Sequence, residues 1–283
     1  MSDSVASLIR RAAKQLSLRG VETAALDARL LLQAAAEIEH ADIVAEPDLI
    51  LAPDVVAKFW SLLERRSALE PVSRILGTRE FYGREFEVTP AVLDPRADTE
   101  TLIEAALPLG KNKTPFRILD LGVGSGAIAV TLLAELPNAT CVATGVSPEA
   151  LAVAQVNATA NGVSNRLNLL QADWFYGITG QFDLIVSNPP YIPAGEIEGL
   201  GVDVKNYDPL GALAGGLDGL EAYGHIARGA VSHLSPFGHV LLEIGAGQER
   251  NVQRLFEASG FVPTGQFRDL AGHIRCLGFN LPH

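Results

Sequence analysis

A glycine-rich loop contains the first residues in this sequence whose spacing suits ligand binding. The segment D-L-G-V-G-S-G begins at Asp120, after a short apolar run and before an alanine-rich stretch. Glycine adopts a positive φ at little cost and lets a ligand approach the main chain closely. The spacing is G-x-G-x-G, unlike the dinucleotide-binding G-x-G-x-x-G, and the loop has no lysine to hold phosphates. The loop therefore favours a ligand with an amino acid end, such as S-adenosylmethionine. A tight strand-to-helix turn is the structural alternative.

A second segment, S-N-P-P-Y from Ser187, is suited to holding a planar –NH2 group. Its prolines fix the backbone and remove two amide donors. The polar groups that remain are acceptors, namely the side-chain oxygen of Asn188 and the carbonyl of Pro189, and Tyr191 adds an aromatic face. An amide or aromatic amine is a poor nucleophile because its lone pair is delocalised. A segment that holds both hydrogens would aim the nitrogen at an electrophilic methyl group. The structural alternative for this segment is a proline-rich turn that ends the strand.

Both segments follow predicted β-strands in the C-terminal part of the chain. Short apolar runs alternate there with helical patterns, which predicts a mainly parallel sheet covered on both faces. Helices are expected from Ala127 and after Pro148. In such sheets ligands bind beyond the carboxyl ends of the strands, so the two segments should face each other. The expected strands are 117–121, 140–144, 167–171, 182–187 and 239–244, followed by strand-like stretches near 261–264 and 275–279.

The N-terminal part shows a different pattern. Its apolar residues recur at helical spacing, and Pro53 suits the first position of a helix. The period then changes to that of strands, with Gly83 as the turn of a β-hairpin. Asp94–Glu104 is expected to open a further helix. The predicted organisation is a helical domain without chemistry of its own (1–75), a hairpin linker (76–95) and a catalytic α/β domain (96–283).

Composition narrows the classes of partner. Of the 283 residues, 48% are hydrophobic, which is enough for a large core. The 22 Lys and Arg against 33 Asp and Glu give a net charge of -11, which argues against binding nucleic acid mainly through its phosphates. Cys141 and Cys276 form no disulfide framework, and the six histidines lack metal-ligand spacing, so no metal site is expected. Neither a secretory signal nor a membrane-spanning run is apparent, and we expect a cytoplasmic protein.

Over nearly its whole length the sequence resembles the peptide chain release factor glutamine methyltransferases, the HemK/PrmC family. N-P-P-Y alone is shared with enzymes that methylate adenine, so the other segments make the resemblance specific. Besides the glycine loop and S-N-P-P-Y-I, they are P-V-S-R-I-L-G-T-R-E-F-Y-G from Pro71, D-P-R-A-D-T-E from Asp94, Q-A-D-W-F from Gln171, G-G-L-D-G-L from Gly215 and E-I-G-A-G-Q from Glu243.

This resemblance implies a fold and an activity. The fold would be α/β, with the Rossmann-like sheet of S-adenosylmethionine-dependent methyltransferases and a small N-terminal helical bundle joined by a β-hairpin. The activity would be methyl transfer to the side-chain amide nitrogen of the glutamine in the Gly-Gly-Gln motif of bacterial class 1 release factors. We expect a monomer that contacts neither nucleic acid nor membrane. The alternatives are an adenine amino-methyltransferase and a binding module that has lost its activity.

The resemblance also implies roles for individual residues. Trp174 would lie against the adenine of the cofactor, and Arg96 would close the site over the substrate. The implied catalytic residues are Asn188, Pro189 and Tyr191. The implied substrate contacts are Asn188, Pro189, Pro190, Tyr191 and Arg96. The implied cofactor-binding residues are Gly122, Val123, Gly124, Ser125, Gly126, Gly145, Trp174 and Asn188.

Two positions depart from the family's pattern. D-P-R-A-D-T-E stands where the family has I-P-R-P-D-T-E, so that Asp94 and Ala97 replace an apolar residue and a proline. Gly145, after the second strand, stands where the family has an aspartate that accepts both ribose hydroxyls. Glu149, one helical turn further on, is the alternative acceptor.

Overall fold

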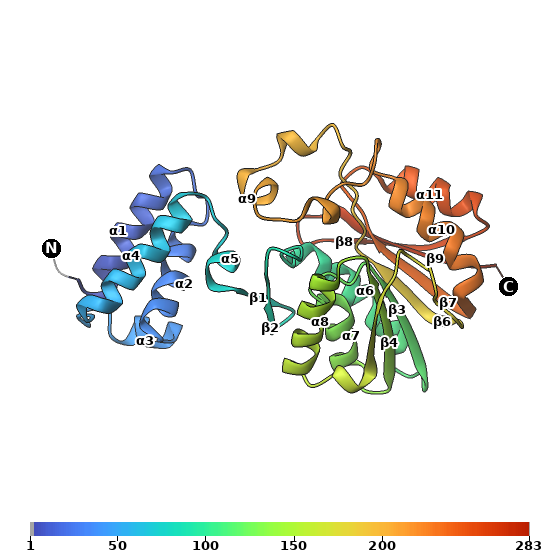
Figure 1. Cartoon of the computed structure of the whole chain (residues 1–283), viewed down its shortest axis with the longest axis horizontal. Helices are drawn as coiled ribbons and strands as arrows, with labels where there is room; N and C mark the ends of the chain where they lie inside the picture. Colours follow the sequence, from blue (N-terminus) through green and yellow to red (C-terminus); the bar gives the residue numbers. More distant parts are fainter. Residues whose placement is uncertain (1–2, 283) are drawn as a thin grey trace. The chain divides into compact units, whose positions relative to one another are not determined.

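Two compact units make up the structure, a computed structural model that describes residues 3–282 (Figure 1). The helical unit runs to Thr78 and includes the short segment Gly201–Tyr207. The sheet unit contains Arg79–Leu200 and the chain from Asp208 onward. One apolar cluster lies in the helical unit, and three lie in the sheet unit.

Amphipathic helices form the helical unit, as the sequence predicts. In α1 the buried residues recur at intervals of three or four, from Val5 to Leu16, and therefore share one face. This face packs with buried residues of α2 and α4, including Phe59. Pro53 is the first residue of α4, where its fixed φ fits a helix start. The helices of the unit are α1 (Val5–Leu18), α2 (Ala24–Ala36), α3 (His40–Ala45), α4 (Pro53–Ser67), α5 (Val72–Leu76) and α9 (Val202–Lys205).

The expected hairpin consists of β1 (Thr78–Phe81) and β2 (Arg84–Glu87). Its two turn residues, Tyr82 and Gly83, have φ of 51° and 68°. Positive φ at both central positions is the geometry of a type I′ turn, whose twist matches that of the strands. The Tyr82 N–H donates to Glu100 Oε1 at 2.9 Å, which ties this turn to the helix start that follows.

The core of the sheet unit is a seven-stranded sheet in the order β5-β4-β3-β6-β7-β9-β8. Strands β3 to β7 run parallel, and β9 is antiparallel to both of its neighbours. The predicted strands are confirmed: β5 and β6 have the expected bounds, and β7 begins earlier than expected. The bounds are β3 (Phe116–Leu121), β4 (Ala139–Gly145), β5 (Leu167–Gln171), β6 (Phe182–Ser187), β7 (Leu234–Glu243), β8 (Val262–Arg268) and β9 (Ile274–Asn280).

Helices cover both faces of this sheet (Figure 1). Alternate residues of β3 point to opposite faces, so that Ile118 packs with α6, α7 and α8 while Leu119 packs with α10 and α11. The helices are α6 (Glu100–Gly110), α7 (Ala127–Glu135), α8 (Pro148–Ala160), α10 (Glu221–His233) and α11 (Glu249–Ala258). Short 3-10 turns are η1 (Ala97–Thr99), η2 (Ser164–Arg166), η3 (Ile197–Gly199) and η4 (Leu210–Ala212).

The helix expected to open at Asp94 begins later. Asp94 precedes Pro95, which disfavours the helical conformation at Asp94. Arg96 is also extended, with φ -100° and ψ 142°. The turn η1 then leads into α6, which leaves Thr99 buried at the junction.

The order of the strands fixes where a ligand can bind. From β3 the chain moves outward through β4 to β5, and it then returns to the other side of β3 with β6. Next to β3 the direction of the winding therefore reverses. The loops after strands that flank such a switch point diverge and leave a crevice at the carboxyl edge of the sheet.

Candidate functional site

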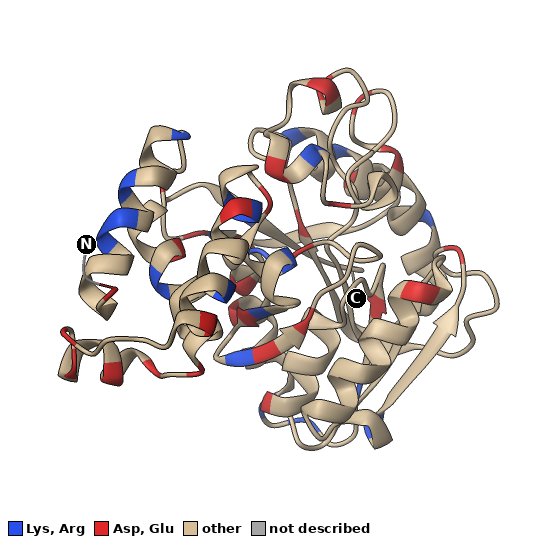
Figure 2. Ribbon diagram, turned by 60° about the vertical axis from the view of Figure 1, so that its left-hand side comes forward, with Lys and Arg blue, Asp and Glu red and all other residues tan. Residues whose placement is uncertain are grey.

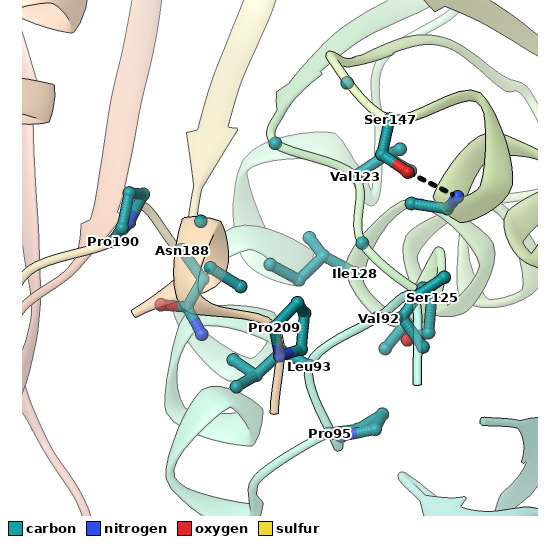
Figure 3. Close-up of a pocket in the computed structure, with 18 of the residues that line it drawn as sticks. Val92, Leu93, Pro95, Val123, Ser125, Ile128, Ser147, Asn188, Pro190 and Pro209 are labelled. Carbon is teal, nitrogen blue, oxygen red and sulfur yellow. Dashed lines mark hydrogen bonds between the residues drawn. The ribbon is translucent and has the colours of Figure 1, made fainter. Parts of the chain in front are cut away.

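A pocket occupies this crevice (Figure 3). The glycine loop after β3, the last residue of β4 and the segment after β6 form its inner wall. The chain before α6 and the turn η4 supply the opposite wall. The structure thus brings together most of the residues that the sequence singles out. Those that line the pocket are Arg96, Gly122, Val123, Gly124, Ser125, Gly145, Asn188 and Pro190.

The glycine loop presents free main-chain donors to the pocket. The N–H groups of Gly122 and Val123 donate to the Thr144 carbonyl at 3.0 and 2.8 Å. Within residues 3–282 no hydrogen bond takes up the N–H groups of Gly124 and Ser125. Both lie just before the N-terminus of α7, where such groups favour a carboxylate.

Gly126 has a packing role beside this loop. Its φ is 84°, and an added Cβ would lie 3.2 Å from the Cβ of Ala154 in α8. Glycine is therefore required for the close approach of α7 and α8. Gly126 does not line the pocket, so its expected contact with the cofactor stays a prediction.

Asn188 is held at one end of its side-chain amide. Its Nδ2 donates to Thr99 Oγ1 at 3.2 Å, and the Thr99 hydroxyl donates to Glu243 Oε2 at 2.6 Å. In the described chain Asn188 Oδ1 receives no hydrogen bond, so it remains available to a ligand donor. Pro190 lies beside it at the rim of the pocket, while Pro189 is buried and does not line it (Figure 3).

Tyr191 points into the protein. Its hydroxyl donates to Glu243 Oε1 at 3.5 Å, and its carbonyl accepts from Gln248 Nε2 at 2.9 Å. Burial and the nearby Glu243 raise the pKa of Tyr191 well above its ordinary value. Tyr191 is not among the lining residues, so a direct contact with substrate stays a prediction.

Trp174 lies away from the lining of the pocket. Its indole stacks on the His225 ring, with centroids 6.1 Å apart and planes at 6°. It packs on the apolar cluster formed with α10 and α11. Its expected contact with an adenine ring therefore stays a prediction.

Arg96 lines the pocket and holds one of its walls. Its Nη2 contacts Asp208 Oδ2 at 2.6 Å, and that carboxylate is almost fully buried. Asp208 precedes Pro209, Gly211 and Ala212, which all line the pocket. Arg96 thus anchors the segment around η4, which forms the outer wall of the pocket, opposite the glycine loop.

Gly145 lines the pocket without offering a side-chain acceptor. The alternative, Glu149, is exposed and does not line the pocket, and its Oε2 accepts from Ser147 Oγ at 2.9 Å. Ser147 Oγ in turn accepts from the Ala150 N–H at 3.1 Å (Figure 3). Glu149 is thus bonded to Ser147 at the start of α8, and its expected role as the alternative acceptor stays a prediction.

Sequence reasoning did not assign roles to Thr99, Asp208 and Glu243. Thr99 and Glu243 lie in D-P-R-A-D-T-E and E-I-G-A-G-Q, so the resemblance drew attention to their segments but not to their contact.

Asp183, near the start of β6, lies at the amino ends of the parallel strands, opposite the ends that carry the pocket. Its carboxylate accepts from Ser235 Oγ and the Arg117 N–H, both at 2.9 Å.

Asp120 is a buried acid below the glycine loop. Neither of its carboxylate oxygens has a hydrogen-bond partner among the described residues. Burial raises its pKa from 3.8 to about 7, and the nearby Ala129 N–H offsets part of this shift. Below about pH 7 the neutral form is therefore favoured in the folded protein.

Asp120→Asn should flatten the dependence of stability on pH. Since the folded pKa lies above the unfolded one, the stability contributed by Asp120 is complete below about pH 4. This contribution to stability is lost as the pH rises to about 7, and it changes little at higher pH. Thermal unfolding of both proteins between pH 4 and 8.5 would measure this difference. Parallel curves would show that Asp120 does not titrate as described.

Residues 3–282 hold no cluster of three or more His, Cys, Asp and Glu that could bind a metal ion. No helix in that range has the length and apolarity needed to cross a membrane. Cys141 and Cys276 are both buried free thiols.

Known sequences resemble both parts of this chain. The PrmC N-terminal domain matches residues 7–77, and the methyltransferase small domain matches residues 98–199. The release factor glutamine methyltransferase of Cereibacter sphaeroides is 48% identical over 98% of each chain. The chain is a member of the release factor glutamine methyltransferase family. Members from Bradyrhizobium diazoefficiens (41% identity, 97% of this chain and 94% of the relative) and Agrobacterium fabrum (39%, 98% and 97%) support this assignment. The alternative of an adenine amino-methyltransferase is not favoured.

Solved structures share the fold of this family member. The catalytic domain of hMettl16 in complex with MAT2A 3′UTR hairpin 6 matches with a TM-score of 0.59 and 17% identity, over 78% of this chain and 82% of that one. The ribosomal protein L11 methylase of Lactobacillus delbrueckii subsp. bulgaricus matches with a TM-score of 0.51 and 22% identity, over 66% and 81%. At these identities the likeness concerns the methyltransferase fold alone.

Proposed function

We propose that this protein transfers a methyl group from S-adenosylmethionine to the glutamine side-chain amide in the Gly-Gly-Gln motif of a class 1 release factor. The observation that carries the proposal is the free Oδ1 of Asn188 at the pocket that the glycine loop lines. That pocket occurs in a chain that matches release factor glutamine methyltransferases over nearly its whole length.

The lining of the pocket supports binding of the cofactor at its methionine end and along apolar walls. The free N–H groups of Gly124 and Ser125 suit a carboxylate such as that of the methionine end. Val92, Leu93 and Ile128 supply apolar walls (Figure 3). The ribose would lie beside Gly145, which supplies no carboxylate to hold it.

The chemistry follows from the acceptors beside the pocket. Bound S-adenosylmethionine would supply an activated methyl group on its sulfonium. Asn188 Oδ1 and the Pro189 carbonyl would each accept one hydrogen of the glutamine –NH2, which turns the nitrogen toward that methyl group. This orientation compensates for the poor nucleophilicity of an amide. As the C–N bond forms, the bond between the methyl group and sulfur would break and leave the cofactor as an uncharged thioether. The nitrogen would then lose its proton to water, so no side chain is assigned as a general base.

The other expected residues receive supporting roles. Arg96 would keep the outer wall closed through Asp208. Pro190 would shape the rim where the glutamine enters. Tyr191 would fix the position of the segment that carries Asn188 and Pro189, since its hydroxyl donates a hydrogen bond to Glu243.

The helical unit would recognise the release factor outside its Gly-Gly-Gln loop. It contains none of the pocket residues, and its helix α1 has basic side chains but no acidic ones (Figure 2). We further propose that the protein acts as a cytoplasmic monomer without direct contact to nucleic acid.

A truncated chain that begins at Arg79 should lose activity on whole release factor more than on a short Gly-Gly-Gln peptide. It retains the sheet unit and the complete pocket, so S-adenosylmethionine binding should persist. Rates on both substrates, measured against the full chain, would test this. Equal losses on protein and peptide would contradict a docking role.

Label transfer tests the proposed function itself. The full chain is incubated with S-adenosylmethionine that carries a labelled methyl group, and with release factor or nucleic acid. We expect label on release factor only. Label on nucleic acid, or on neither, would contradict the proposal.

A further inference from the structure

Three groups from distant parts of the chain form one hydrogen-bonded row, which runs from the pocket-lining Asn188 and Thr99 to the buried Glu243. Glu243, the last residue of β7, accepts from the Thr99 hydroxyl at 2.6 Å. Thr99, just before α6, accepts from Asn188 Nδ2 at 3.2 Å. Glu243 and Thr99 are both buried, so water does not compete for these bonds.

We propose that Glu243, acting through Thr99, is a positioning residue that fixes which end of the Asn188 amide faces the substrate. This inference rests on the proposed function, in which Asn188 Oδ1 accepts a hydrogen from the glutamine amide. It assigns a role in the reaction to Thr99, which lines the pocket, and to Glu243, which does not.

The direction of the hydrogen bonds follows from the chemistry of each group. An ionised carboxylate only accepts hydrogen bonds. The single hydroxyl hydrogen of Thr99 must therefore point to Glu243, which leaves a lone pair of Thr99 facing Asn188. Only the Nδ2 end of Asn188 can donate to that lone pair. The Oδ1 end is consequently left for the substrate.

Reversing the direction of donation along these hydrogen bonds would oppose the reaction. A neutral amide or carboxylic acid at position 243 can donate to Thr99, whose hydroxyl then donates onward to Asn188. The Asn188 amide would turn over and present Nδ2 to the glutamine –NH2. Two donors would face each other, and one of the two acceptors that aim the nitrogen would be lost.

Other groups around Glu243 leave this direction unchanged. The Tyr191 hydroxyl donates to the other carboxylate oxygen at 3.5 Å, which is consistent with an acceptor at this position. The Tyr223 hydroxyl donates to the backbone carbonyl of Glu243 at 3.0 Å. The titratable and charged groups that face Glu243 are Asp98 beside α6, Tyr191 after β6, Tyr223 of α10, and Arg275 and Cys276 of β9.

The pKa of Glu243 makes the row sensitive to pH. Burial raises it to about 7, with a further rise from Asp98 and opposing effects of Thr99, Arg275 and Tyr191. Above pH 7 the carboxylate is ionised and the row has one direction. As the pH falls below 7, protonation supplies a donor at Glu243 and the direction is no longer fixed.

Two nearly isosteric substitutions test the proposal at pH 8.5 in the full chain. Glu243→Gln introduces a donor, and Thr99→Val removes the connecting hydroxyl. Each should lower kcat for release factor methylation by about 10- to 100-fold, by analogy with the loss of hydrogen-bond partners that orient metal ligands. The Kd for S-adenosylmethionine should change less than kcat, because Glu243 does not line the pocket and Thr99→Val nearly keeps the size of the side chain that does. Thr99→Ser retains the hydroxyl and should restore most of the rate.

Asp183→Asn is the matched control. Asp183 also accepts from a hydroxyl, that of Ser235, but at the opposite edge of the sheet. Its substitution should leave kcat unchanged, which separates the role of the row from a general effect on the sheet.

The pH profile provides a second readout that a purely structural role would not affect. In the parent, kcat should fall as the pH decreases through about 7, the pKa of Glu243. In Glu243→Gln this decline should be absent, because position 243 no longer titrates.

Parental kcat values in both Glu243→Gln and Thr99→Val would overturn the proposal, as would an equal loss in Asp183→Asn. If either variant fails to fold, the rate and the pH profile of the other variant still decide. The parental profile alone would not, because Asp120 also has a pKa of about 7. Failure of the proposed function looks different, because the parent itself would then not methylate release factor.

Discussion

Asn188→Ala should lower the rate of release factor methylation by about a hundredfold or more. The substitution removes the free Oδ1 and with it one of two acceptors that aim the glutamine nitrogen. Small misplacements of reacting groups cost this much because the near-attack geometry is lost. The lost bond to Thr99, 3.2 Å long in the parent, should reduce stability by only about 1 kcal/mol. Initial rates at saturating S-adenosylmethionine, together with thermal unfolding, would measure both effects.

The control for this substitution is Asn165→Ala. Asn165 is exposed in η2 and does not line the pocket. Its rate should equal that of the parent. If Asn188→Ala also methylates release factor at the parental rate, the substrate amide is not held by this side chain.

Gly145→Asp should tighten the binding of S-adenosylmethionine by about tenfold. A carboxylate at the end of β4 would accept hydrogen bonds from the ribose hydroxyls, each bond to a charged group contributing roughly 1.5–3 kcal/mol. We expect the lower end of that range because water can bridge part of the present gap. Space is available, since an added Cβ would lie 3.4 Å from Val123 Cγ1 and 3.7 Å from Leu151 Cδ2. Calorimetric titration of parent and variant would give both Kd values.

Two further variants isolate the role of the charge. Gly145→Asn has nearly the same size but no charge, and should improve affinity less. Glu149→Gln should leave the Kd unchanged, because its carboxylate is exposed and bonded to Ser147. An unchanged Kd in Gly145→Asp would mean that another group already holds the ribose. A weaker Kd in Glu149→Gln would identify that group as Glu149.

Local sequence patterns were sufficient to predict most of the sheet. β5 and β6 are apolar runs bounded by turn residues, and they have the expected bounds. Helix α10 is harder to predict, because Gly224 and Gly229 are poor helix formers. Its buried face, which includes Tyr223 and Ile226, stabilises it through packing on the sheet. At Gly229 the side chain of Phe175 occupies the space that a Cβ would take, so the glycine serves tertiary packing at the expense of helix propensity.

The site was predictable only in part, for a similar reason. The glycine loop and the Asn188 segment each follow a strand directly, so strand order alone brings them to one edge. The contact between Thr99 and Glu243 joins residues 144 positions apart and depends on the late start of α6 and the end of β7. Neither boundary could be placed closely enough from sequence. The bond between Glu149 and Ser147 likewise required side-chain positions, and the role of Glu149 at the ribose stays a prediction.

The central claim is that the amide nitrogen of one release factor glutamine receives the methyl group. The most direct measurement is mass spectrometry of proteolytic fragments of release factor after incubation with the full chain and S-adenosylmethionine. We expect one added methyl group on the glutamine of the Gly-Gly-Gln fragment, and none when Asn188→Ala replaces the parent for the same short incubation. Unmodified glutamine, or a methyl group on any other residue, would contradict the assignment.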